Sequence, residues 1–224
     1  MAARPRIKVK VCCIASVQEA QIARAFGAAA LGLVSTMPSG PGVISDRTVA
    51  EVASALRGTA ARTFLLTART KAAEIAAQHA AAGTTTLQLV DQVPLDELRA
   101  LRVLCPGVEL VQVVHVTGES SVDEALEVAA CVDGVLLDSG NPALAVKELG
   151  GTGRTHDWAL SRRIRDALFP LPLWLAGGLG EHNVAQAIAA VRPHGLDLCT
   201  SVRSNGQLDA AKLAAFMAAV RACA

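Results

Sequence analysis

Lys10 and Cys12 have side chains suited to acid–base chemistry. They lie two residues apart in the run of residues 7–12, so an extended strand points both to the same face. A nearby ammonium favours the thiolate and lowers the pKa of a thiol from about 8.5 toward neutrality, which makes Cys12 a candidate base. The alternative is that Cys12 is a small buried hydrophobe, the usual state of a free cysteine. Cys13 alternates to the opposite face, and we expect it to pack against helices.

Asp138 is a second candidate for acid–base work, because it ends the apolar run 135–137. An unpaired carboxylate inside an apolar core is costly, so Asp138 is expected at the open end of its strand. An aspartate in that position can also cap a turn. An acid and a base that face each other across one ligand are what acid–base isomerisation requires.

Two glycine-rich turns and a hydroxyl pair are able to bring backbone N–H groups against a phosphate. The loops after the last two strands of a barrel often bind phosphate, and the predicted phosphate-binding residues are Gly177, Gly178, Thr200 and Ser201. Residues 150–154 read Gly-Gly-Thr-Gly-Arg. We expect them to form a mobile loop that closes over substrate, with Gly151, Gly153 and Arg154 as contacts.

Alternating strands and helices must position these residues. Apolar runs typical of strands lie at 7–14, 30–34, 62–66, 85–90, 109–116, 133–137, 172–176 and 195–199. Alanine-rich helical patterns lie at 17–27, 46–57, 70–82, 94–104, 120–131, 157–168, 181–191 and 209–222. Eight such units predict an α/β fold, a (β/α)8 TIM barrel, as a single domain over residues 1–224. The competing doubly wound sheet usually has fewer strands and a G-x-G-x-x-G turn after the first one, whereas this turn reads Cys-Cys-Ile-Ala-Ser.

Composition and charge exclude several classes of protein. The formal net charge is +1, without the clustered basic face of a nucleic-acid-binding protein, and no apolar run approaches the length of a membrane helix. The six cysteines form no C-x-x-C pair, so we expect reduced thiols in a cytoplasmic enzyme and no zinc site. The low aromatic content of 3% shows no interface patch, and we expect a monomer or a homodimer.

The set of motifs resembles the phosphoribosylanthranilate isomerase family over the full length of the chain. The residues that carry the resemblance are Lys10-Val11-Cys12, Leu136-Leu137-Asp138, the segment 149–158 and Ala176-Gly177-Gly178. The resemblance implies the Amadori rearrangement of N-(5'-phosphoribosyl)anthranilate in tryptophan biosynthesis. It further implies that Cys12 is the base, that Asp138 is the general acid and that Lys10 and Gln88 contact substrate. Neither a metal nor an organic cofactor is implied. The related isomerase of the histidine pathway is disfavoured, since it has a carboxylate where Cys12 stands.

Three positions depart from the family pattern. The loop at 37–43 lacks the arginine that binds the anthranilate carboxylate, Gln88-Leu89-Val90-Asp91 lacks the family histidine, and Ser201-Val202-Arg203 replaces the usual end of the last strand. The candidates for a cation that replaces the missing arginine are Arg47, His115, Arg154 and Arg203. The departures keep two alternatives open: a paralogous isomerase that acts on another phosphosugar, or a non-catalytic barrel that binds a phosphorylated ligand.

Overall fold

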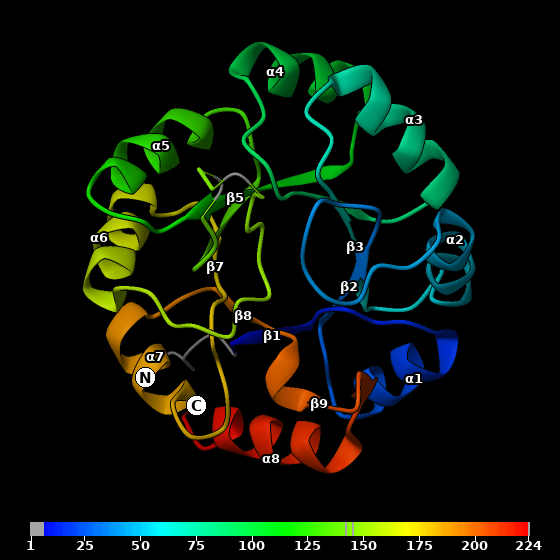
Figure 1. Ribbon diagram of the computed structural model, residues 1–224, viewed down its shortest axis with the longest axis vertical. Helices are drawn as coiled ribbons and strands as arrows, with labels where there is room; N and C mark the ends of the chain where they lie inside the picture. Colours follow the sequence, from blue (N-terminus) through cyan, green and yellow to red (C-terminus); the bar gives the residue numbers. More distant parts are fainter. Residues whose placement is uncertain (1–6, 142, 145, 224) are drawn as a thin grey trace.

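The computed structural model describes residues 7–141, 143, 144 and 146–223, and in this part of the chain eight parallel strands close into one barrel. Figure 1 shows the strands at the centre and the helices as an outer ring. The strands are β1 (Lys8–Val11), β2 (Ala30–Val34), β3 (Arg62–Thr67), β4 (Thr86–Leu89), β5 (Glu109–His115), β6 (Gly134–Asp138), β7 (Leu173–Leu175) and β8 (Gly195–Leu198). The helices are α1 (Val17–Ala25), α2 (Asp46–Ala55), α3 (Ala72–Ala82), α4 (Leu95–Leu104), α5 (Ser120–Ala129), α6 (Trp158–Leu168), α7 (Val184–Val191) and α8 (Ala210–Arg221). The predicted (β/α)8 barrel is confirmed, and every predicted strand and helix overlaps its element.

The first and last strands close the barrel, because β1 pairs with both β2 and β8. In this register Lys10 lies beside Ala30 on one side and Asp197 on the other. The carboxyl ends of parallel strands face the same way, so the loops that follow the strands gather at one end of the barrel. We call this end the mouth.

Two apolar layers hold the barrel. The outer one lies between sheet and helices and includes Val9 and Val11 of β1. The inner one fills the barrel and includes Phe64 and Trp174, whose rings meet edge to face with centroids 5.6 Å apart. Lys10 is fully buried in this interior, with its ammonium 5.4 Å from the centre of the Phe64 ring, so β1 alternates as the sequence predicts.

Helix starts follow side-chain capping. Ser45 accepts a hydrogen bond from the N–H of Thr48 and begins α2. Asp157 caps α6, because its carboxylate accepts hydrogen bonds from two backbone N–H groups that are otherwise free at the start of the helix. After β8 the chain makes a short 3-10 turn, Thr200–Val202, and a small hairpin of β9 (Arg203–Ser204) and β10 (Gln207–Leu208). None of the helices described is long and apolar enough to cross a membrane.

Candidate active site

The mouth holds a cavity of about 80 Å³ that brings together most of the predicted site residues. Those that line it are Cys12, Gln88, Asp138, Gly151, Gly153, Gly177, Gly178 and Thr200. Lys10 lies beneath the cavity, while Arg154 and Ser201 are exposed beside it. The residues predicted on separate strands therefore converge on one place.

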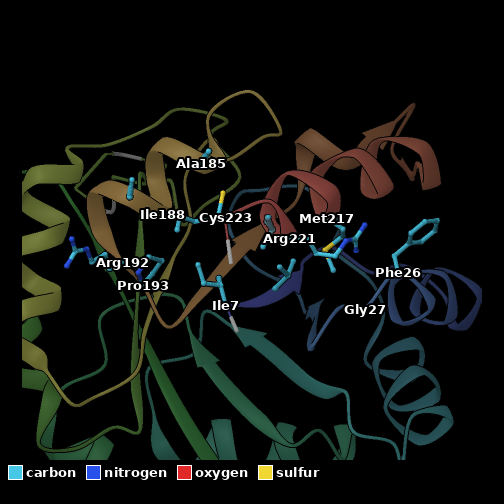
Figure 2. A pocket seen from close by; sticks show the side chains of 13 residues that line it. Ile7, Phe26, Gly27, Ala185, Ile188, Arg192, Pro193, Met217, Arg221 and Cys223 are labelled. Carbon is cyan, nitrogen blue, oxygen red and sulfur yellow. The ribbon is translucent and has the colours of Figure 1, made fainter. Parts of the chain in front are cut away.

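A larger cavity, of about 660 Å³, lies at the opposite end of the barrel (Figure 2). Its walls come from the start of β1, from α7 and from α8, and include Ile7, Ile188 and Met217. Its lining is mainly aliphatic, and the titratable groups described there are Arg192, Arg221 and Cys223. No acid–base pair lines it within the described residues, so the cavity at the mouth is the candidate active site.

The Cys12 thiol is almost entirely buried, with 7% of the residue exposed. Gly32 of β2 faces it: a Cβ added at Gly32 would lie 2.7 Å from the Cys12 Sγ and 3.0 Å from the Lys10 Nζ. The missing side chain thus makes room for the sulfur and the ammonium together. Cys12 points into the barrel beside Lys10, as the alternation of β1 predicts.

The predicted fall in the pKa of the Cys12 thiol is wrong for this structure. Burial raises that pKa to about 11, and the nearby Lys10 ammonium only partly offsets the effect. Desolvation disfavours a thiolate. In addition, Asp197 already balances the lysine, because the Lys10 Nζ donates to the Asp197 Oδ2 at 2.7 Å. In this state the Cys12 side chain is seldom ionised, and the thiolate, when it forms, is a strong base.

Lys10 and Asp197 form a buried ion pair between neighbouring strands. Burial by itself lowers the pKa of Lys10, but the Asp197 carboxylate outweighs it and the pKa is raised. The second carboxylate oxygen of Asp197, Oδ1, has no protein partner, and Asp197 lines the cavity. The pair therefore places one unsatisfied acceptor next to the thiol.

Asp138 enters the cavity from the end of β6, three strands from β1 around the closed barrel by way of β8 and β7. Only 8% of the residue is exposed, and its Oδ1 accepts a hydrogen bond from the N–H of Ser139 at 2.7 Å. The described contacts leave its Oδ2 unpaired below Gly150. Asp138 thus presents a carboxyl oxygen to the same space as the Cys12 sulfur.

The glycine turn after β7 adopts the conformation that exposes backbone N–H groups. Gly177 and Gly178 have φ angles of 81° and 59°, and successive backbone N–H groups in a turn can form an anion-binding concavity. A Cβ at Gly178 would lie 2.8 Å from the carbonyl carbon of Arg154, so the loop that follows β6 packs directly on this turn. Thr200 lines the cavity from the end of β8.

The expected reduced state of all six cysteines and the outward direction of Cys13 are wrong. Cys13 and Cys199 form a disulfide, and both line the cavity. Strand β1 ends at Val11 and Cys13 has a φ of 61°, so the alternation of the strand no longer applies to it. Cys12, Cys105, Cys131 and Cys223 remain free.

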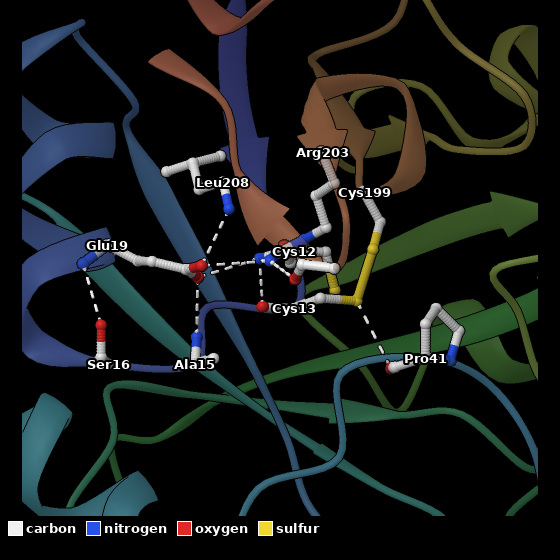
Figure 3. A network of polar contacts seen from close by, with 10 residues as sticks. Cys12, Cys13, Ala15, Ser16, Glu19, Pro41, Cys199, Arg203 and Leu208 are labelled. Atoms are coloured by element: carbon white, nitrogen blue, oxygen red, sulfur yellow. Dashed lines mark hydrogen bonds and ion pairs between the residues drawn. A yellow bond between two sulfur atoms is a disulfide. The ribbon is translucent and has the colours of Figure 1, made fainter.

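Arg203 secures the backbone around this disulfide (Figure 3). Its guanidinium donates to the carbonyl oxygens of Cys12 and Cys13 and pairs with Glu19 at 3.1 Å. Glu19 in turn accepts from the N–H groups of Ala15 and Leu208. Arg203 is therefore a scaffold for the loop after β1 and has no charge to offer to substrate.

Two loops form a roof over the cavity, which we define as residues 37–43 and 147–153. A Cβ at Gly151 would lie 2.4 Å from the Pro41 Cδ, and the Ser39 Oγ donates to the Lys147 carbonyl at 2.5 Å. The Lys147 Nζ donates to the Asp91 Oδ2 at 2.6 Å. The roof thus reaches from the end of β6 across to the ends of β2 and β4.

The other cations proposed from the sequence are engaged elsewhere. Arg154 pairs with Glu148 at 2.5 Å in an exposed position, and Arg47 pairs with Glu51 on the surface of α2. His115 is buried, with its Nε2 3.2 Å from the Val90 carbonyl oxygen. None of the three lines the cavity. Among the described residues, no cluster of His, Cys, Asp and Glu has the makeup of a metal site.

Sequence reasoning missed Asp197, Arg203 as a scaffold, and the contact between Lys147 and Asp91. Asp197 carried a usable signal, because it is a charged residue inside an apolar strand just as Lys10 is. Because β1 and β8 are neighbours in every closed (β/α)8 barrel, an ion pair between the two charges could have been predicted. The pairing of Lys147 with Asp91 joins two loops 56 residues apart and had no local signal.

Comparison with known proteins identifies one family. Residues 9–219 match the family model of N-(5'-phosphoribosyl)anthranilate (PRA) isomerase. The chain is 32% identical to the N-(5'-phosphoribosyl)anthranilate isomerase of Thermosynechococcus vestitus, over 95% of this chain and 89% of that protein. It is also 32% identical to that of Synechococcus elongatus, over 96% of each.

Solved structures agree with this assignment of the fold. The phosphoribosyl anthranilate isomerase of Thermus thermophilus aligns with a TM-score of 0.81 at 24% identity, over 97% of this chain and all of that one. A phosphoribosyl anthranilate isomerase in complex with reduced 1-(o-carboxyphenylamino)-1-deoxyribulose 5-phosphate aligns with a TM-score of 0.79 at 24% identity, over 96% and 99%.

Proposed function

Because this chain belongs to the N-(5'-phosphoribosyl)anthranilate isomerase family, we propose that its mouth carries out the Amadori rearrangement with Cys12 and Asp138 as base and acid. The chain is an isomerase of tryptophan biosynthesis. Its substrate is N-(5'-phosphoribosyl)anthranilate and its product is 1-(2-carboxyphenylamino)-1-deoxyribulose 5-phosphate. The observation that carries the proposal is that Cys12 from β1 and Asp138 from β6 line one cavity.

The first step opens the furanose ring. Asp138, as the carboxylic acid, donates its proton to the ring oxygen while the bond between that oxygen and the anomeric carbon breaks. The lone pair of the anthranilate nitrogen forms the C=N bond, so the product of this step is a protonated imine. The hydrogen bond from the Ser139 N–H leaves the second carboxyl oxygen of Asp138 to face the ligand.

The second step moves a proton from carbon. The Cys12 thiolate removes the proton from the ribose carbon next to the imine, and the electron pair of that C–H bond neutralises the nitrogen to give an enol-amine. Tautomerisation then returns a proton to the former anomeric carbon and releases one from the enol oxygen, which yields the ketone. The mechanism uses protein groups alone and calls for neither a metal nor an organic cofactor.

Backbone groups are proposed to hold the phosphate. Gly177 and Gly178 offer N–H groups from the left-handed turn after β7, and Thr200 and Ser201 add a hydroxyl and an N–H from the end of β8. The phosphate then lies on the β7 and β8 side of the mouth. Gly151 and Gly153 of the roof cover the bound ligand, and Gln88, whose Oε1 is buried without a partner, is free to accept a hydrogen bond from it.

The test follows the fluorescence of freshly prepared phosphoribosylanthranilate, which is lost on turnover. Removal of a general acid or base lowers turnover by about two to four orders of magnitude, and we expect this of Cys12→Ala and of Asp138→Asn. Cys105→Ala, which removes a free thiol outside the cavity, serves as the control. Near-normal turnover by a folded variant would remove that residue from the mechanism.

A cytoplasmic location fits this function. A doubly charged phosphate ester does not cross a bilayer unaided, so an enzyme that consumes one is expected in the compartment that makes it. The small-molecule phosphorylated substrate is the partner that the site requires. A dimeric phosphoribosylanthranilate isomerase is known from Thermotoga maritima, and a monomer or a homodimer is expected here, which sedimentation analysis distinguishes.

A further inference from the structure

We propose that the Lys147 ammonium binds the carboxylate on the aromatic half of the substrate, as a specificity-determining residue that the roof contributes. The inference rests on the proposed function, because the substrate of that reaction carries a phosphate at one end and an anthranilate carboxylate at the other. A carboxylate that leaves water without a cationic partner loses a strong charge-assisted hydrogen bond. The site therefore needs a cation opposite its phosphate end.

The direction of the substrate across the mouth follows from the positions of its partners. The phosphate lies beside the turns after β7 and β8, and Cys12 and Asp138 flank the sugar. The aromatic half then extends to the remaining side of the mouth, where β2, β3 and β4 end. That side is the one where Lys147 of the roof contacts Ser39 and Asp91.

The wall of the cavity itself provides no cation. None of the described residues that line it is a lysine, an arginine or a histidine, and two of them, Asp138 and Asp197, are acids. A substrate carboxylate that faced only this wall would lie near acidic side chains with no cation to pair with. The cation must come from a residue just outside the present lining.

Four of the cations on the β2 to β4 side lie near the carboxyl ends of these strands, and three of the four pair with acids on helices. Arg47 pairs with Glu51 of α2, Arg69 pairs with Glu74 of α3, and Lys71 pairs with Glu97 of α4. These acids all belong to the outer ring of helices. The fourth cation is Lys147, which belongs to the roof.

Lys147 is tied to the cavity through its backbone as well as its side chain. Its carbonyl accepts from Ser39, a lining residue, and Leu149, two residues further on, also lines the cavity. Its side chain is 45% exposed, and the Asp91 carboxylate that it meets at 2.6 Å is 11% exposed. The ammonium is thus anchored at the end of β4 by a nearly buried acid, while part of it stays open.

The chemistry of an ammonium suits this position. Lys147 has three N–H donors, and the structure uses one of them on Asp91, so two remain for an incoming carboxylate. Asp91 keeps the ammonium in place before substrate arrives, which reduces the entropy lost on binding. The lysine then bridges two carboxylates, one from the protein and one from the ligand.

The experiment compares two ligands in the full-length protein. One is the reduced product analogue, 1-(2-carboxyphenylamino)-1-deoxyribitol 5-phosphate, and the other is the same compound without the ring carboxylate. Lys147→Met should weaken binding of the first by about 10- to 100-fold, the range for a lost hydrogen bond between charged groups. It should leave the affinity for the second unchanged. Lys147→Arg should keep the preference for the carboxylate, and Lys71→Met, which removes a surface lysine, should alter neither affinity.

Two results would overturn the inference. An equal loss of affinity for both ligands would show that Lys147 only holds the roof, and no loss for either would show that the carboxylate binds elsewhere. Failure of the proposed function is seen separately, in the unsubstituted protein: it would neither turn over phosphoribosylanthranilate nor bind the carboxylated analogue. In that case the role of Lys147 fails with the function on which it rests.

Discussion

Breaking the Cys13–Cys199 disulfide should remove up to about 5 kcal/mol from the free energy of unfolding. The two cysteines are 186 residues apart, so the bond closes most of the chain into one loop in the unfolded state. For a loop of that length the lost chain entropy is about 18 cal/mol/K, which gives about 5 kcal/mol at 25 °C. In a chain of this size such a loss lowers the melting temperature by about 10–20 °C.

The assay begins by counting thiols. In guanidinium chloride without reductant, four of the six cysteines should react with a thiol reagent, because Cys12, Cys105, Cys131 and Cys223 are free. Denaturant unfolding of the oxidised protein, the reduced protein and Cys199→Ala then gives the free energies. The uncrosslinked chains should also show a larger m value, since their unfolded states expose more surface.

Cys223→Ser is the matched control, because Cys223 is a free thiol at the end of α8. Six reactive thiols in the unreduced protein would refute the reasoning at its first step. A Cys199→Ala variant as stable as the Cys223→Ser variant would refute the second step, that the closed loop stabilises the fold.

Three further predictions concern the site. Because burial raises the pKa of the Cys12 thiol to about 11 and only the thiolate is nucleophilic, the rate at which iodoacetamide alkylates Cys12, followed by peptide mapping, should rise by about tenfold per pH unit above neutrality; a rate that levels off above about pH 8.5, as for an ordinary thiol, would contradict it. Asp197→Asn leaves the buried Lys10 ammonium without a counter-charge and should destabilise the protein by about 3–5 kcal/mol in urea unfolding, whereas Lys10→Met in the same chain should restore much of the loss; a double variant no more stable than the single one would argue against the ion pair. Gly178→Ala puts a Cβ 2.8 Å from the Arg154 backbone and should weaken competitive inhibition by inorganic phosphate by about tenfold, as for a lost hydrogen bond to a charged group; unchanged inhibition would move the phosphate away from this turn.

Much of the barrel was predictable because each strand and helix carries its own periodicity. The direction of Lys10 and Cys12 followed from the two-residue repeat of a single strand, and the position of Asp138 followed from the end of an apolar run. The same repeat predicted the wrong direction for the Cys13 side chain. The repeat assumes that the strand continues, whereas the left-handed φ of 61° at Cys13 ends the extended backbone. Local patterns describe elements well and their ends poorly.

The remaining errors concern a pKa value and long-range contacts that depend on the folded structure. The pKa of Cys12 depends on how completely the thiol is desolvated and on how much of the Lys10 charge Asp197 takes up, and neither can be read from spacing. The disulfide between Cys13 and Cys199 and the contact of Lys147 with Asp91 join segments far apart in the chain.

The absence of a side chain at Gly32 limits which substitutions can stabilise this enzyme. Glycine inside a strand is ordinarily an easy target for stabilisation, because a β-branched residue there loses less entropy on folding and packs better. At this position any added carbon would lie 2.7 Å from the Cys12 sulfur and would displace the base or the strand. Selection for stability and selection for turnover therefore both favour glycine at residue 32. A library screened only for heat resistance should therefore retain glycine there, because the nearest atoms belong to the buried Cys12 and Lys10.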